Sequence, residues 1–239
     1  DAAAPTPVEG KFSPTGMVRT GEARPTWTWE FTDAGSGLDY YIVTFDEEAS
    51  FRTTATSFRP ASKLDSGVYV LTVEAVDKVG NKAEHTFPDV TVDVTPPEVP
   101  GMPTTTSPTK NKQPVWKWAH IANAAGDLKQ YNVYLDGSLK GSVTDSPWPD
   151  DITWGTPDEL THGRHVLEVT SVDDLGNESA KSTAGHVFID LEKPTKPIMN
   201  PMPEYSKKGP ITFSWSASSD DLAVDYRFQY KIGTADWST

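Results

Sequence analysis

The chain has 239 residues and a formal net charge of −13, with 34 acidic residues against 21 basic ones. No cluster of Lys and Arg is long enough to follow a phosphate backbone, so nucleic acid is excluded as an expected partner. The absence of cysteine excludes disulfides, thiolate zinc sites and thiol nucleophiles. With 20 Pro, 17 Gly and no apolar run long enough to span a membrane, we expect short strands, many turns and no membrane span.

Taken in chain order, the first predicted element is Pro-Thr-Trp-Thr-Trp at 25–29. It returns as Pro-Val-Trp-Lys-Trp at 114–118 and as Pro-Ile-Thr-Phe-Ser-Trp at 210–215. A tyrosine follows each copy, at Tyr41, Tyr131 and Tyr226. The sequence therefore starts the same unit three times.

The next elements complete the unit twice. Leu-Asp-Ser-Gly at 64–67 matches Leu-Thr-His-Gly at 160–163, and apolar residues then alternate along 69–75 with the period of two that predicts a half-buried strand. Asp-Lys-Val-Gly-Asn at 77–81 returns as Asp-Asp-Leu-Gly-Asn at 173–177. Glycine at that position tolerates a positive φ, and the Asp and Asn side chains can bond the local backbone, so each segment is predicted to be a hairpin turn.

Proline-rich connections separate the units. Residues 92–100 and 189–197 each combine acidic residues with prolines, which stiffen a short linker and remove ladder donors. We predict domains at 1–95 and 96–192, and the N-terminal part of a third repeat at 193–239, which would make the chain a fragment of a longer protein.

The order of these motifs resembles the bacterial immunoglobulin-like, or fibronectin type III-like, repeats of large surface or secreted proteins. The resemblance covers nearly the whole chain, although His165 stands where the first copy has Tyr69, which removes the hydroxyl of a tyrosine corner. It implies an all-β fold class: tandem immunoglobulin-like β-sandwiches, two complete and a third truncated.

The resemblance also implies a calcium site between domains, where carboxylates near the linker hold the ion. In this topology Asp93 is expected to approach Asp173, Asp174 and Asn177, together with Asp127. By the same logic Asp190 and Glu192 are expected to face Asp220 and Asp221 of the third repeat, as an incomplete second site. The alternative is that Asp173 forms a local turn and the linker acids are solvated. Calcium is the only cofactor that the sequence suggests.

Trp148 and Trp154 lie in the segment where the second repeat has most of its extra residues. Exposed aromatic rings can stack on sugars, so these two residues are candidates for a glycan-binding surface. The alternative is that they cover the open edge of the core.

No nucleophile with a base, carboxylate pair in a cleft or phosphate loop is recognisable, so we expect no enzymatic activity. The sequence favours a structural or adhesive stalk of a bacterial surface or secreted protein, presenting a distal module. The alternatives are a carbohydrate-binding module and the accessory domains of a secreted enzyme. Expected partners are neighbouring repeats of the same chain and a cell-surface glycan or protein, and the expected location is extracellular or at the cell surface.

Overall fold

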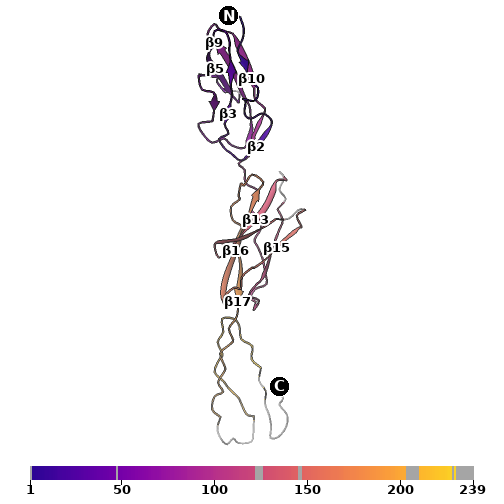
Figure 1. Ribbon diagram of the computed structural model, residues 1–239. Coiled ribbons are helices and arrows are strands. Elements are labelled where there is room, and N and C mark those ends of the chain that lie inside the picture. Colours follow the sequence, from indigo (N-terminus) through magenta and orange to yellow (C-terminus); the bar gives the residue numbers. More distant parts are fainter. Residues whose placement is uncertain are drawn as a thin grey trace.

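The computed structural model describes residues 2–46, 48–121, 126–144, 147–202, 210–227 and 229. Figure 1 shows two β-domains following one another end to end, with the third segment beyond them. The strands of the first domain are β1 (Thr6–Pro7), β2 (Val18–Thr20), β3 (Trp27–Thr28), β4 (Phe31–Thr32), β5 (Leu38–Phe45), β6 (Phe51–Thr53), β7 (Ser57–Phe58), β8 (Gly67–Tyr69), β9 (Leu71–Asp77), β10 (Lys82–Thr86) and β11 (Val90–Val92).

The first domain is built around one four-stranded antiparallel sheet in the order β10-β9-β5-β6. Facing it are the smaller sheets β2-β11-β8, β1-β4 and β3-β7. In the three-stranded sheet β11 runs antiparallel to β8 but parallel to β2, with Thr91 opposite Arg19. This pairing brings β2 beside the strand that leads into the linker.

The second domain repeats the plan. Its strands are β12 (Val115–Ala119), β13 (Leu128–Leu135), β14 (Ser138–Val143), β15 (Asp151–Gly155), β16 (Gly163–Asp173) and β17 (Gly185–Ile189). They form a four-stranded sheet, β14-β13-β16-β17, and a two-stranded sheet, β12-β15. The single long strand β16 corresponds to β8 and β9 of the first domain.

Each domain has its own core between its sheets. Trp27 and Trp29 are both buried in the first domain, and Trp116 and Trp118 are buried in the second, as residues two apart on one face of a strand should be. Alternate residues of β13 are buried in the same way, up to Leu135. Facing, largely antiparallel sheets with a core between them form an immunoglobulin-like β-sandwich, which confirms the predicted fold class.

The third segment carries the corresponding residues without a closed core among those described. Met199 pairs with Trp215, and Trp215 and Tyr226 are 38% and 42% exposed. Residues 203–209, 228 and 230–239 of the predicted third repeat lie outside the described residues. In the described part of the chain, no helix is long and apolar enough to cross a membrane.

Candidate functional site: the joint between the domains

The Asp-x-x-Gly-Asn turns are closed by their own side chains. Asp173 Oδ1 accepts the backbone N–H groups of Leu175 and Asn177 at 3.0 and 2.8 Å, and its Oδ2 accepts the Asn177 side-chain amide at 2.8 Å. Asp77 does the same for Val79 and Asn81 in the first domain. A positive φ of 90° at Gly176 completes the second turn, a conformation that glycine adopts without strain. These contacts explain why a buried aspartate is tolerated at Asp173.

The same turn binds the linker that enters the domain. Asn177 Nδ2 donates to the backbone oxygen of Asp93 at 3.0 Å. Gly21 lies against the turn, because a Cβ atom added there would be 3.3 Å from both the Cβ and the backbone oxygen of Leu175. The second domain therefore contacts both β2 and the linker of the first.

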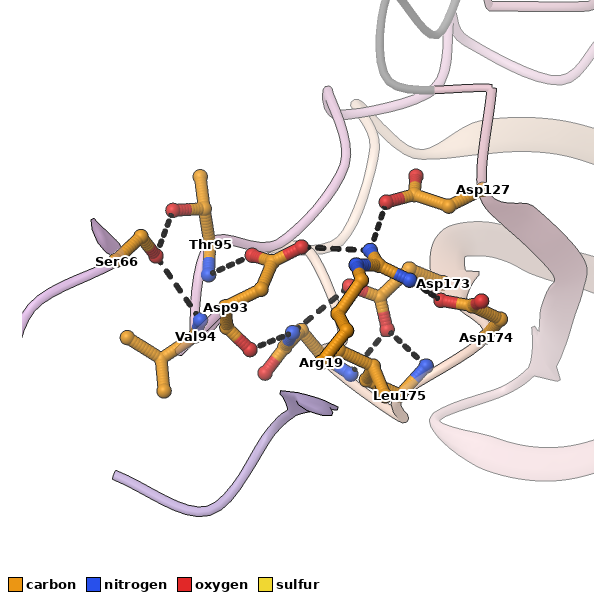
Figure 2. Close-up of polar contacts among 10 residues, drawn as sticks. Arg19, Ser66, Asp93, Val94, Thr95, Asp127, Asp173, Asp174 and Leu175 are labelled. Atoms are coloured by element: carbon orange, nitrogen blue, oxygen red, sulfur yellow. Dashed lines mark hydrogen bonds and ion pairs between the residues drawn. The ribbon is translucent and has the colours of Figure 1, made fainter. Parts of the chain in front are cut away.

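Arg19 lies at the centre of this contact, as Figure 2 shows. Its guanidinium donates to Asp93 Oδ2 at 2.7 Å, to Asp174 Oδ1 at 2.5 Å, and to Asp127. The planar fork of arginine suits this task, because it can donate to several carboxylates at once. We call the cluster of Arg19, Gly21 and Asp93 with Asp127, Asp173, Asp174, Leu175 and Asn177 the first joint.

The contacts of the first joint favour the ionised forms of Asp93 and Arg19. Burial raises the pKa of Asp93, but the Thr95 N–H and the Arg19 guanidinium outweigh burial and hold this pKa below its ordinary value. Hydrogen bonds from Arg19 to Asp174 and Asp93 raise the pKa of the guanidinium further. The carboxylate side chains of Asp93 and Asp127 are 19% and 12% exposed, so water screens them only in part.

The structure brings five of the six predicted calcium ligands to one place. Carboxylate oxygens of Asp93, Asp127 and Asp173 lie within 4.8 Å of one another, and Asp174 and Asn177 contact the same cluster. Calcium needs six to eight oxygen ligands, whereas oxygens of Asp93 and Asp127 already accept from Arg19. The donor set fits calcium only if the arginine moves away, so calcium at the first joint stays a prediction.

Sequence reasoning missed Arg19. It is a basic residue in a short, largely exposed strand, and its role depends on the parallel pairing of β2 with β11, which no local pattern indicates.

Asp190, the sixth predicted ligand, lies at the other end of the second domain. There His162 Nε2 is 2.9 Å from Asp221 Oδ2 and 3.9 Å from Glu192 Oε1, and its Nδ1 is 4.0 Å from Asp190 Oδ1. We call these four residues the second joint, because Asp221 belongs to the third segment.

The two tryptophans proposed for glycan binding are partly buried against the second core. Trp148 stacks on His120 with ring centroids 5.4 Å apart and meets Tyr131 edge to face. Trp154 pairs with Trp116 across β15 and β12, and its indole nitrogen lies 3.9 Å from where a Cβ atom would stand at Gly141, in β14 of the other sheet. These contacts favour the alternative in which both side chains cover the edge of the core.

No family model matches the chain. The chain is 31% identical over 159 residues to exoglucanase B of Cellulomonas fimi and 33% identical over 140 residues to chitinase A1 of Niallia circulans. These matches cover 63% and 56% of this chain but only 14% and 19% of the relatives. A third relative, amylopullulanase of Thermoanaerobacterium saccharolyticum, is 23% identical over 273 residues, which cover 95% of this chain and 21% of the enzyme.

Solved structures with a similar fold include the fibronectin(III)-like modules of Clostridium thermocellum CbhA, at a TM-score of 0.40 and 18% identity over 76% of this chain and 95% of that one. A Ca2+-stabilized adhesin of an Antarctic bacterium gives a TM-score of 0.44 and 17% identity, over 84% of this chain and 52% of that one. Both TM-scores are below 0.5, so the fold assignment rests on the strand topology.

Proposed function

We propose that this chain is a non-catalytic spacer, or stalk, of an extracellular bacterial protein, and that it holds a distal module at a fixed distance. The observation that carries the proposal is the first joint, where Arg19 and Asp93 of one domain are bound by Asp127, Asp174 and Asn177 of the next. Contacts on both the linker and β2 restrain the angle between the domains as well as their separation. A flexible tether would need neither.

The names of the relatives support one kind of protein in which this spacer would occur, a secreted enzyme that acts on a polysaccharide. An exoglucanase and a chitinase are named for glucan and chitin, which are insoluble or very large polymers that enzymes meet outside the cell. In such a protein the spacer would be an accessory region that sets the reach of a catalytic module. In a surface protein the same construction would form a stalk.

Interdomain distances test the proposal directly. Since the chain has no native cysteine, spin labels can be attached to Glu84→Cys and Leu139→Cys, one exposed position in each domain. We expect a narrow distance distribution in the parent protein and a broad one in Arg19→Gln. Arg52→Gln is the matched control, because it removes the same charge from the outer face of the first domain, where Arg52 stacks on Tyr40. Equal widths in all three proteins would contradict the proposal.

Calcium is tested in the same experiment. If Arg19 is the cation that normally neutralises the joint, millimolar calcium should leave the distance distribution of the unmutated chain unchanged. In Arg19→Gln the carboxylates no longer bind arginine and can bind calcium, so the ion should narrow the distance distribution of this variant. Narrowing of the parent distribution by calcium would instead support the ion as a normal part of the joint.

Carbohydrate binding is the competing function. A spacer is expected to leave insoluble cellulose and chitin unbound, in pull-down assays with this chain alone. The glycan-binding function would be favoured over the spacer if this chain bound either polymer, the Trp154→Ala variant did not bind it, and the Trp215→Ala variant still did.

A further inference from the structure

The two joints are built on the same plan but differ in their cation. Asp93 N–H donates to Thr20 O at 2.9 Å, and Asp190 N–H donates to Thr109 O at 2.9 Å, so the two linkers leave their domains in the same way. Arg19 precedes Thr20, whereas the residue before Thr109 is Pro108. The second joint therefore has no guanidinium at the position from which the first joint neutralises its acids.

His162 does not replace Arg19 at the second joint. It corresponds instead to Ser66 of the first domain. Ser66 Oγ accepts the N–H of Val94 at 3.0 Å, and His162 Nδ1 accepts the N–H of Leu191 at 3.2 Å. The imidazole is thereby held with its Nε2 facing Asp221 and Glu192. The side chain of His162 is 26% exposed, which leaves the site open to solutes from solvent.

We propose that the second joint takes its cation from solution, as a divalent transition metal ion bound by His162 Nε2 and the carboxylates of Glu192 and Asp221. One ligand atom from each residue lies within 4.8 Å of the others. A tetrahedral ion with bonds of about 2.1 Å separates its ligands by about 3.4 Å. The observed separations from Nε2, 2.9 Å to Asp221 and 3.9 Å to Glu192, lie on either side of that value.

The types of ligand atom at the second joint favour zinc over calcium. An imidazole nitrogen with two carboxylates suits zinc, which binds His and Asp or Glu in tetrahedral sites and accepts water as a fourth ligand. Calcium prefers oxygen ligands only and takes six or more of them. The site should therefore prefer zinc to calcium, unlike the carboxylate cluster of the first joint.

Metal binding changes the tautomer of His162. In the metal-free joint Nδ1 accepts from Leu191, so the ring proton is on Nε2 and is donated to Asp221. The ion replaces that proton at Nε2, the neutral ring then carries its proton on Nδ1, and Nδ1 no longer accepts the N–H of Leu191. Asp190 Oδ1 is 4.0 Å from Nδ1, so the ring must turn toward it before Asp190 can accept that proton and complete the carboxylate–histidine–metal arrangement common in metal sites.

Calorimetric titration of this chain with zinc and with calcium tests the proposal, together with 15N spectra of the histidine rings. We expect one zinc ion per chain, a weaker response to calcium, and a change of the His162 tautomer on zinc binding. His162→Asn should weaken zinc binding by at least about tenfold. His186→Asn is the matched control, because His186 is an exposed histidine that contacts Arg164 on the same domain.

Zinc affinity that is equal in His162→Asn and the unmutated chain would overturn the proposal. So would the absence of binding by the unmutated chain at about 1 mM zinc, the weak end of the range known for extracellular calcium modules. Zinc bound by both His162 of the second domain and Asp221 of the third segment would stiffen the second joint, and this consequence rests on the spacer function. The binding itself does not, since a broad distance distribution at the first joint would refute the spacer while leaving zinc binding at His162 intact.

Discussion

Asn177 of the second domain donates a side-chain hydrogen bond to the backbone oxygen of Asp93, which belongs to the linker, at 3.0 Å. The matching residue of the first domain, Asn81, donates to the backbone oxygen of Ala3 at the same distance. The last residue of each Asp-x-x-Gly-Asn turn therefore holds the segment that enters its domain. The motif closes a hairpin and also docks the preceding part of the chain.

Replacing Asn177 by Ala should loosen the first joint. The substitution removes the donor to Asp93 and one partner of Asp173, so we also expect the second domain to lose about 1–2 kcal/mol of stability. Spin-label distances should broaden and the chemical denaturation midpoint should fall. Asn81→Ala should destabilise the first domain without broadening these distances, and a broadening of equal size in both variants would contradict the docking role.

Acid should release the first joint. The pKa of Asp93 is lower in the folded protein than in the unfolded chain. The stability that ionised Asp93 contributes to the joint is therefore fully present above its unfolded pKa and is lost as the pH falls through its folded pKa. We expect narrow spin-label distributions at pH 5 and broader ones well below pH 4, near the ordinary aspartate pKa of about 3.9. High salt at neutral pH should act in the same direction but more weakly, because the acids are partly shielded from solvent. A width independent of both pH and salt would exclude an ionic joint.

Gly185 leaves no room for a side chain. A Cβ atom at this position would lie 2.0 Å from the backbone oxygen of Pro103 and 3.1 Å from the Trp116 ring. Gly185→Ala should therefore destabilise the second domain by about 2–3 kcal/mol, as overpacking forces the backbone apart. Gly155→Ala in the same domain is the control, since a Cβ atom there meets nothing within 4 Å. Equal denaturation midpoints for the two variants would show that the segment at Pro103 moves freely.

His165 should make the second domain pH-dependent. Its Nε2 lies 3.0 Å from Thr161 O, the bond that Tyr69 makes to Asp65 O in the first domain, so a histidine replaces the tyrosine at this corner. Its Nδ1 lies 2.8 Å from Asp136 Oδ2. Burial lowers the pKa of His165, but its bonds to Asp136 and Thr161 outweigh burial and raise it.

A raised histidine pKa stabilises the fold fully below the unfolded pKa of about 6.5, and this stability is lost as the pH rises through the folded value. The melting temperature of the second domain, followed through the backbone amides of β16, should therefore fall as the pH is raised from 6 to 8. His165→Tyr, which restores the residue of the first domain, should remove much of this slope. Other titratable groups line the same cavity of about 240 Å3: Lys140, Asp158 and Glu159. An unchanged slope in His165→Tyr would show that His165 is not the source of the pH dependence.

The linear sequence was sufficient for the repeat and the sandwich. Alternation along strands such as β12 and β13 is a local consequence of which face meets the core, and the turn at 173–177 is closed by contacts within five consecutive residues. Even the approach of Asp93 to Asp173 and Asn177 followed from the expected end-to-end order of sandwiches. These features depend on short-range periodicity or on a topology that the repeated motifs identify.

The partner that the acids meet at each joint depends on the folding of the whole chain. Arg19 reaches Asp127 and Asp174 because β2 pairs in parallel with β11, a contact between distant segments that no local pattern specifies. His162 reaches Asp221 because Leu191 N–H orients its ring toward the third segment. Long-range strand pairing and side-chain orientation arise from packing the whole domain, so the sequence alone gives the positions of the carboxylates and the folded chain gives their partners.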